Sequence, residues 1–220
     1  MKVFVRILLI LVILLVVAGI GFVGYGIYKK ATLQVQNPIA TMEVEGYGTI
    51  KMELYPDMAP NTVANFIKLA NNGYYNGLNF HRTIPDFMIQ GGSKNGDGTG
   101  SPKLSDLKEV KEEEDKEYCI PGEFIANGYN DNILKHETGV VSMARASYGN
   151  QSTEILKKGY NSAGSQFFIM HKDAPYLDGS YAAFGHVVDG IEVVDKIAST
   201  RTGANDRPLE RVIIARAYII

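Results

Sequence analysis

The sequence has little of several residue types on which many enzyme sites depend. Cys119 is the single cysteine, which excludes an intramolecular disulfide and any zinc site built from several cysteines. The four histidines show no His-x-x-x-His spacing, the pattern typical of a helical zinc site. The formal net charge is only -2, whereas nucleic-acid-binding domains are usually basic. Composition therefore argues against a metal site and a nucleic-acid partner, and nothing in it indicates a cofactor.

Two catalytic loop motifs are also absent. The glycine-rich stretch 91–100 lacks the Gly-Lys-Ser/Thr ending of a phosphate-binding loop, so we interpret it as turns beside a binding groove. No Gly-x-Ser-x-Gly elbow is present, although the many serines and four histidines leave a hydrolytic triad open on composition alone. The consecutive acids Glu112 to Asp115 do not alternate as calcium ligands do, and we interpret them as solvated surface.

The N-terminal thirty residues are dominated by apolar side chains. Ile7 to Tyr28 contains no charged residue, and about 20 apolar residues suffice to span a bilayer. No small-x-small cleavage site follows the run, as a cleaved signal peptide would require. We therefore expect an uncleaved transmembrane signal-anchor over 1–30, a short linker over 31–38 and a folded domain over 39–220.

The orientation of this anchor is weakly indicated by charge. Lys2 and Arg6 precede the apolar run, and Lys29 and Lys30 follow it. The tendency of positive charge to stay cytoplasmic therefore barely favours one orientation over the other. The short N-terminal tail is typical of signal-anchors whose N-terminus stays inside. We expect a single-pass protein of the cell membrane whose folded domain lies outside the cytoplasm.

From residue 39 onward, the hydrophobic pattern indicates short strands and a few helices. Alternation over 41–54 is typical of a hairpin with one wet face. Pro60 can open a helix because its missing N–H is not needed there, and Asn72-Gly73 can end that helix. Residues 193–197 suggest a second short helix, and 212–220 a final, well-buried strand. Many short strands with one or two helices favour a β-barrel.

The stretch 80–92 holds the most distinctive chemistry. It reads Phe-His-Arg-Thr-Ile-Pro-Asp-Phe-Met-Ile-Gln-Gly-Gly and places one permanent cation, Arg82, among apolar residues. In a strand, alternation would direct Arg82, Met88 and Gln90 to one side, with Pro85 as an interruption. An arginine beside Met and Phe is costly to desolvate without hydrogen-bond partners. Taken alone, the stretch indicates an edge strand whose arginine faces water.

A second stretch, 161–170, changes that interpretation. It reads Asn-Ser-Ala-Gly-Ser-Gln-Phe-Phe-Ile-Met. Together, the two stretches resemble the two signature runs of the cyclophilin family of peptidyl-prolyl cis-trans isomerases, in that family's order. The matching runs are Phe-His-Arg-x-Ile-x-x-Phe-Met-Ile-Gln-Gly-Gly and Gly-Ser-Gln-Phe-Phe-Ile. The resemblance extends over 39–220. It implies a mainly β fold, an eight-stranded antiparallel β-barrel capped by helices, with family strands at 120–124 and 139–144.

The resemblance also implies a reaction, the rotation of X–Pro peptide bonds in unfolded or extended protein segments. The barrier is about 20 kcal/mol because rotation breaks amide resonance. No bond is made or broken, so the catalyst must stabilise the twisted amide rather than supply a nucleophile. Arg82 offers a charged, rigid donor for the proline nitrogen, which gains a lone pair only when the amide twists.

Family roles carried over by matching position make Arg82 the catalytic residue, with His81 in a supporting role at most. Gln90 would hold Arg82 or the substrate backbone, and Gln166 would line the groove. Ala144 and Arg145 would offer backbone hydrogen bonds to an extended peptide. The proline pocket would be formed by Phe87, Met88, Phe168 and Leu177.

Three positions depart from the best-known eukaryotic pattern and look more like bacterial cyclophilins. Tyr176 replaces a Trp that contacts the drug cyclosporin, Tyr181 replaces a pocket His, and Arg145 replaces an Asn. We therefore expect cyclosporin to bind weakly. The segment 147–160 is an insertion beside the expected groove, and it would either shape substrate choice or form a plain surface loop.

One alternative function uses the same groove without catalysis. A membrane-tethered peptide-binding chaperone would also bind proline-containing polypeptides. Arg82, Phe87, Gln90 and Phe168 are all present, and this set favours an active isomerase.

Overall fold

The structure is a computed structural model that describes residues 36–108, 115–149 and 152–220, together with 16, 19 and 21–22. Most of the predicted anchor over 1–30 and most of the linker over 31–38 lie outside the described residues. In the described parts of the chain, no helix combines the length and the apolar character needed to cross a bilayer. Residues from Asn37 to Ile220 belong to one compact unit.

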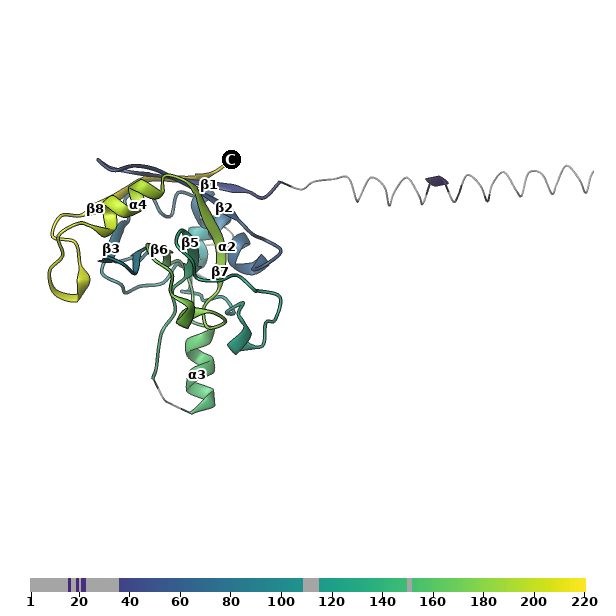
Figure 1. The fold of residues 1–220 in the computed structure, drawn as a ribbon. Coiled ribbons are helices and arrows are strands. Elements are labelled where there is room, and N and C mark those ends of the chain that lie inside the picture. The colour runs from purple at the N-terminus through teal and green to yellow at the C-terminus, as the bar shows by residue number, and fades with distance from the viewer. Residues whose placement is uncertain (1–15, 17–18, 20, 23–35, 109–114, 150–151) are drawn as a thin grey trace, which may run out of the picture. The chain divides into compact units, whose positions relative to one another are not determined.

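Eight antiparallel strands close into a barrel, which confirms the predicted fold (Figure 1). Their order around the barrel is β1-β2-β7-β5-β6-β4-β3-β8. The strands are β1 (Ile39–Val44), β2 (Gly48–Leu54), β3 (Asn79–Ile84), β4 (Met88–Gly91), β5 (Val140–Met143), β6 (Phe167–Met170), β7 (Ala183–Asp189) and β8 (Val212–Ile219). The interior is filled by large apolar side chains, among them Phe66, Phe80, Phe167 and Phe184.

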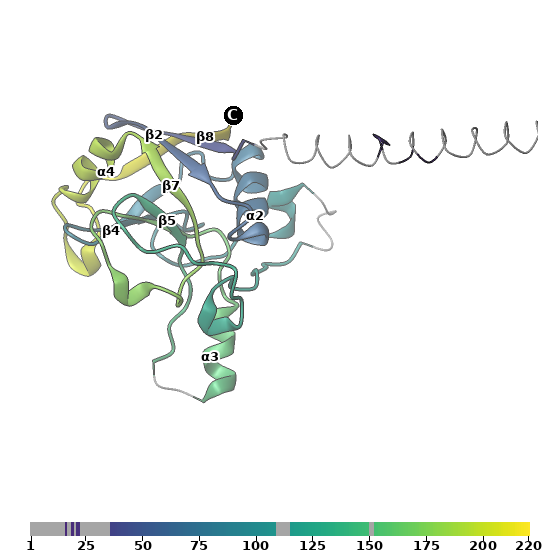
Figure 2. The ribbon, with the colours of Figure 1, turned by 45° about the vertical axis from the view of Figure 1, so that its right-hand side comes forward.

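Within residues 36–108, 115–149 and 152–220, three α-helices accompany the barrel: α2 (Pro60–Asn71), α3 (Thr153–Tyr160) and α4 (Ile191–Ala198). Figure 2 shows α2 and α4 flanking the barrel, whereas α3 extends away from it. Pro60 is at the start of α2, and Asn72 follows its last residue, as predicted. Short 3₁₀ turns are η1 (Leu104–Leu107), η3 (Ile125–Asn127), η4 (Pro175–Leu177) and η5 (Ala204–Asp206).

Two strand predictions need correction. Residues 120–124 contain no regular strand; Ile120 forms only an isolated bridge with Ala163. The last strand, β8, is not buried throughout, because Ala215 and Arg216 on it are exposed. The pairing of β8 with β1 shifts register beside Glu43, which interrupts the alternation of buried and exposed residues on β8 at this point. Residues on the outer face of the barrel are in contact with solvent.

The segment 120–124 has another structural use, since its Glu123 caps α2. The buried Glu123 carboxylate accepts hydrogen bonds from the backbone N–H groups of Asn61 (2.9 Å) and Thr62 (2.8 Å). It also accepts from the Asn61 amide (2.9 Å) and the Thr62 hydroxyl (2.7 Å). Ala59, at the N-cap position, has no side chain that could do this. A carboxylate here also interacts favourably with the helix dipole.

Candidate active site

Arg82 is positioned by the hairpin β3–β4. The stretch 80–92 is not one strand, because a turn over 85–87 separates its halves, with Asp86 in the left-handed region at φ +57°. Arg82 lies opposite Gln90 in register, and Ile84 lies opposite Met88. The pairing therefore puts Arg82, Met88 and Gln90 on one face, as the alternation predicted.

A pocket of about 290 Å³ opens beside Arg82, and it is called the apolar pocket below for the Phe87, Met88, Phe168 and Leu177 side chains in its wall. Its lining comes from the β3–β4 hairpin, β6, the residues after β5 and the loop before β7: Arg82, Phe87, Met88, Gln90, Ala144, Arg145, Ser147, Phe168, Leu177 and Tyr181. All but Ser147 were predicted as site residues. Met88, Phe168 and Leu177 are buried there. Gln90 pairs with Phe168 across β4 and β6, so strand pairing explains how the two signature stretches meet.

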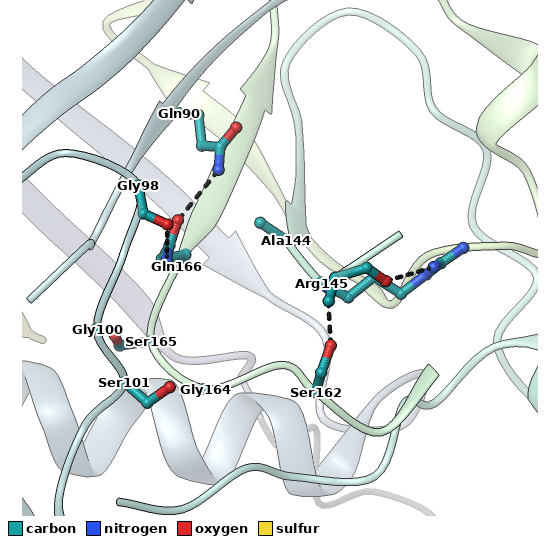
Figure 3. Close-up of a pocket in the computed structure, with 11 residues that line it drawn as sticks. Gln90, Gly98, Gly100, Ser101, Ala144, Arg145, Ser162, Gly164, Ser165 and Gln166 are labelled. Carbon is teal, nitrogen blue, oxygen red and sulfur yellow. Dashed lines mark hydrogen bonds between the residues drawn. The ribbon is translucent and has the colours of Figure 1, made fainter. Parts of the chain in front are cut away.

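A second, more polar pocket of about 280 Å³ adjoins the first (Figure 3). The two share Gln90, Ala144 and Arg145, so they form one groove. Its lining is Gln90, Gly98, Gly100, Ser101, Ala144, Arg145, Ala146, Ser162, Gly164, Ser165 and Gln166. The Gln90 amide donates to Gln166 Oε1 at 3.2 Å, and the Gln166 amide donates to the Gly98 carbonyl at 3.0 Å. Turns of the glycine-rich stretch thus border the groove.

Two predicted peptide contacts are modified by the geometry. The Ala144 N–H donates to the Gln166 carbonyl at 2.9 Å, so only the Ala144 carbonyl could serve a bound peptide. Tyr176 stands outside the apolar pocket, with 72% of its surface exposed. Its ring stacks on Phe87, with 6.1 Å between ring centres.

Asp206 is a partner of Arg82 that the sequence did not reveal. Arg82 Nε donates to Asp206 Oδ2 at 3.2 Å, and both side chains are a little under half exposed. Asp206 and the preceding Asn205 both have left-handed backbones, at φ +56° and +60°. Such conformations are sparsely populated by residues other than glycine. The turn η5 therefore holds a carboxylate against the guanidinium from a distant part of the sequence.

His81 lies beside Arg82 but carries no charge at neutral pH. It is 4% exposed, and neither ring nitrogen has a hydrogen-bond partner within the described residues. Burial, assisted by the positive charge of Arg207, lowers the pKa of His81 to about 4. The imidazole therefore adds no second positive charge next to the guanidinium.

A serine, a histidine and an aspartate come together behind the apolar pocket. His136 Nδ1 lies 3.2 Å from Asp178 Oδ1, and His136 Nε2 lies 3.1 Å from Ser142 Oγ. These are the residue types of a hydrolytic triad. Ser142 is completely buried in the barrel wall, however, where no substrate carbonyl can reach its hydroxyl. The His136 ring instead stacks on Phe168 at 6.0 Å, so the three residues support the pocket.

The barrel and its groove agree with the comparisons to known proteins. The family described as cyclophilin type peptidyl-prolyl cis-trans isomerase/CLD matches residues 39–219. The chain therefore belongs to the cyclophilin-type peptidyl-prolyl cis-trans isomerases, and it is an enzyme of that class. The roles of individual residues in the groove remain predictions.

Individual relatives cover most of the chain. The peptidyl-prolyl cis-trans isomerase of Synechococcus elongatus is 41% identical over 178 residues, 81% of this chain and 97% of that protein. Peptidyl-prolyl cis-trans isomerase B of Bacillus subtilis is 40% identical over 156 residues, 71% and 87% of the two chains. The chain spans 25% of a longer relative, peptidyl-prolyl cis-trans isomerase-like 2 of Gibberella zeae.

A solved structure shares the fold. It is a cyclophilin type peptidyl-prolyl cis-trans isomerase of Cryptosporidium parvum, crystallised in the presence of the dipeptide Ala-Pro. The two chains are 28% identical and superpose with a TM-score of 0.65 over 83% of this chain and 98% of that one.

Proposed function

We propose that Arg82 catalyses X–Pro rotation in a proline ring seated in the apolar pocket. The observation that supports this most is the position of Arg82, a permanent cation on the rim of a pocket lined by Phe87, Met88, Phe168 and Leu177. The apolar side chains would hold the ring, and the guanidinium would face the amide nitrogen. Proline-containing polypeptides are the substrates.

The guanidinium would act on the twisted amide and not on the planar forms. Resonance withdraws the nitrogen lone pair in both planar isomers, and rotation restores it. A donor aimed at this nitrogen therefore binds the transition state more strongly than the ground state, which is the condition for raising kcat. Apolar surroundings strengthen the interaction, and each 1.4 kcal/mol of such stabilisation is about a factor of ten in rate.

The substrate chain would continue from the apolar pocket into the polar one. Gln90 and Gln166 lie between the two pockets, and the Ala144 carbonyl and the Arg145 backbone border both. An extended peptide along this line would present the residues before its proline to the polar pocket. This arrangement suits unfolded segments, because a folded protein rarely exposes several extended residues around one proline.

We also propose that residues 1–30 anchor the enzyme in the cell membrane, with its domain outside the cytoplasm. The support is the uncharged run Ile7 to Tyr28 and the short tail before it. Polypeptides leaving a translocon are unfolded, and their X–Pro bonds equilibrate over tens of seconds or longer unaided. A tethered isomerase would assist their folding at the membrane.

Protease added to intact spheroplasts tests this placement. We expect the isomerase domain to be degraded while cytoplasmic marker proteins survive. Protection of the domain until the membrane is lysed would place it in the cytoplasm, and release of the full chain by a salt wash would contradict the anchor.

Weak cyclosporin binding and a bacterial-like groove belong to the same proposal. The support is the set of departures at Arg145, Tyr176 and Tyr181. Tyr176 offers a smaller ring than the Trp of the best-known pattern and is largely exposed beside Phe87. Replacing Tyr176 with Trp is expected to tighten inhibition of the isomerase by cyclosporin. Nanomolar inhibition of the wild type would contradict this expectation.

A further inference from the structure

The Arg145 side chain occupies a fixed position in the wall of the groove. Its guanidinium lies over the rings of Tyr181, Tyr160 and Phe124, at 4.4, 4.9 and 5.5 Å from the ring centres. Arg145 Nε donates to the Ser180 carbonyl at 3.0 Å, and Nη1 donates to the Ala146 carbonyl at 3.1 Å (Figure 3). Rings and carbonyls together fix both the plane and the direction of the guanidinium.

On one side, this guanidinium contacts the wall of the apolar pocket. Tyr181 lines that pocket, and its ring meets Phe168 edge to face, with 5.6 Å between ring centres and 86° between the planes. Phe168 in turn stacks on His136, which Asp178 and Ser142 hold. The Arg145 contact therefore helps fix the position of the Tyr181 ring in the wall of the pocket proposed for the proline.

On the other side, the guanidinium contacts the insertion. Tyr160 is the last residue of α3 and of the inserted segment 147–160. Its ring also packs edge to face on Phe124 at 5.3 Å. The insertion thus supplies one of the aromatic rings over which the guanidinium lies, and Arg145 contacts both Tyr160 and the pocket residue Tyr181.

The C-terminal end of α3 is fixed to the chain that leaves β5. A side-chain carbon added at Gly159 would lie 2.8 Å from the Ala146 carbonyl and 3.0 Å from the Tyr148 ring, so only glycine permits this approach. The Ser162 hydroxyl accepts from the Ala146 N–H at 2.8 Å and donates to the Gly159 carbonyl at 2.7 Å. Tyr160 is therefore held firmly enough to position the guanidinium.

We propose that Tyr160 is a positioning residue for proline binding, which acts by holding the Arg145 guanidinium against Tyr181. This proposal rests on the proposed use of the apolar pocket for the proline ring. The ring stays in the pocket while the bond before it rotates, so contacts with the pocket wall are equal in ground and transition states. Losing such uniform binding raises KM and leaves kcat unchanged.

The test compares variants of the full chain, kept in detergent, on a proline tetrapeptide over a range of concentrations. Tyr160→Leu removes the ring and is expected to raise KM about threefold to tenfold, with kcat unchanged, from the usual strength of cation–π contacts. Tyr160→Phe keeps the ring and should restore the wild-type KM. Ile155→Ala is the control, since Ile155 is an exposed apolar residue of α3 in the same insertion.

A double-mutant cycle separates positioning from general stability. In an Arg145→Met background, Tyr160→Leu should raise KM no further, because the link to Tyr181 is already lost. If Tyr160→Leu fails to fold, Arg145→Lys provides a second test, and it should raise KM because an ammonium is not planar and cannot lie flat against an aromatic ring. An unchanged KM, an equal rise in the Arg145→Met background, or an equal rise in Ile155→Ala would overturn the role of Tyr160. Wild-type kcat in Arg82→Ala would instead refute the proposed site itself.

Discussion

At the scale of single residues, the surroundings of Arg82 are compatible with its proposed action on a proline nitrogen. Asp206 accepts from Nε, and the proposed substrate contact would use the Nη groups. His81 is buried and neutral, so it does not repel the guanidinium. The sequence indicated Arg82 through its motif, but Asp206 lies 124 positions away and only the folded chain brings the two together.

Asp206→Ala should reduce kcat about threefold to tenfold with little change in KM, because a guanidinium that is free to rotate is less often aimed at the nitrogen. Stability should change by less than about 1 kcal/mol, since the pair is nearly half exposed. Peptide isomerisation kinetics and urea unfolding measure the two effects. Asn205→Ala is the control, because it imposes similar backbone strain in the same turn without touching the ion pair. An equal loss of kcat in both variants would refute the role of Asp206.

The buried His81 should make the free energy of unfolding fall in mild acid. Its pKa is about 4 in the folded state and about 6.5 in an unfolded chain, so the unfolded state binds more protons between these values. The stabilisation is fully present above pH 6.5 and is lost as the pH falls toward 4, by at most about 1.4 kcal/mol per pH unit. Burial lowers the pKa of His136 in the same direction.

Urea unfolding at pH 7.5, 6 and 4.5 measures this loss. Carboxylates titrate in part of the same range, so the informative quantity is the difference from His81→Asn, which should lose less stability between pH 6.5 and 4.5. Identical pH slopes in the two proteins would show that His81 is not buried in its neutral form.

At the scale of elements, sequence patterns predicted the features that depend on residues close together in the sequence. Alternation placed the hairpin of β1 and β2, and Pro60 with Asn72-Gly73 marked the ends of α2. The prediction of a strand at 120–124 was wrong because Glu123 from that segment caps α2, a use that no local pattern indicates. The helix α3 was likewise left as a possible loop, since it is short and is held by contacts with residues outside it.

Glu123→Ala should destabilise the protein by about 2 to 4 kcal/mol. The change removes the carboxylate that accepts four hydrogen bonds at the start of α2, and it leaves the backbone N–H groups of Asn61 and Thr62, the second of them buried, without this partner. Urea unfolding at pH 7.5 measures the loss, and Asp131→Ala, at an exposed acidic residue, is the control. A free energy of unfolding within about 0.5 kcal/mol of the wild type would show that the cap is not needed.

At the scale of the whole molecule, barrel closure gathers the site from distant stretches. Strand β4 joins β3 on one side and β6 on the other, so Arg82, Gln90 and Phe168 become neighbours. Motif resemblance predicted the pocket residues because these pairings belong to the fold. It could not predict Ser147 or Tyr160, which come from an insertion and reach the groove through side-chain packing.

The most direct test of this account is the rate of cis–trans exchange in a short proline peptide with the full chain and with its Arg82→Ala variant. Removing a donor aimed at the transition state typically lowers kcat by about 100-fold or more, and we expect a loss of that size. The variant should unfold in urea within about 1 kcal/mol of the wild type, because the arginine is surface-exposed in part. Wild-type exchange rates in a folded Arg82→Ala protein would contradict the proposal that Arg82 drives the rotation.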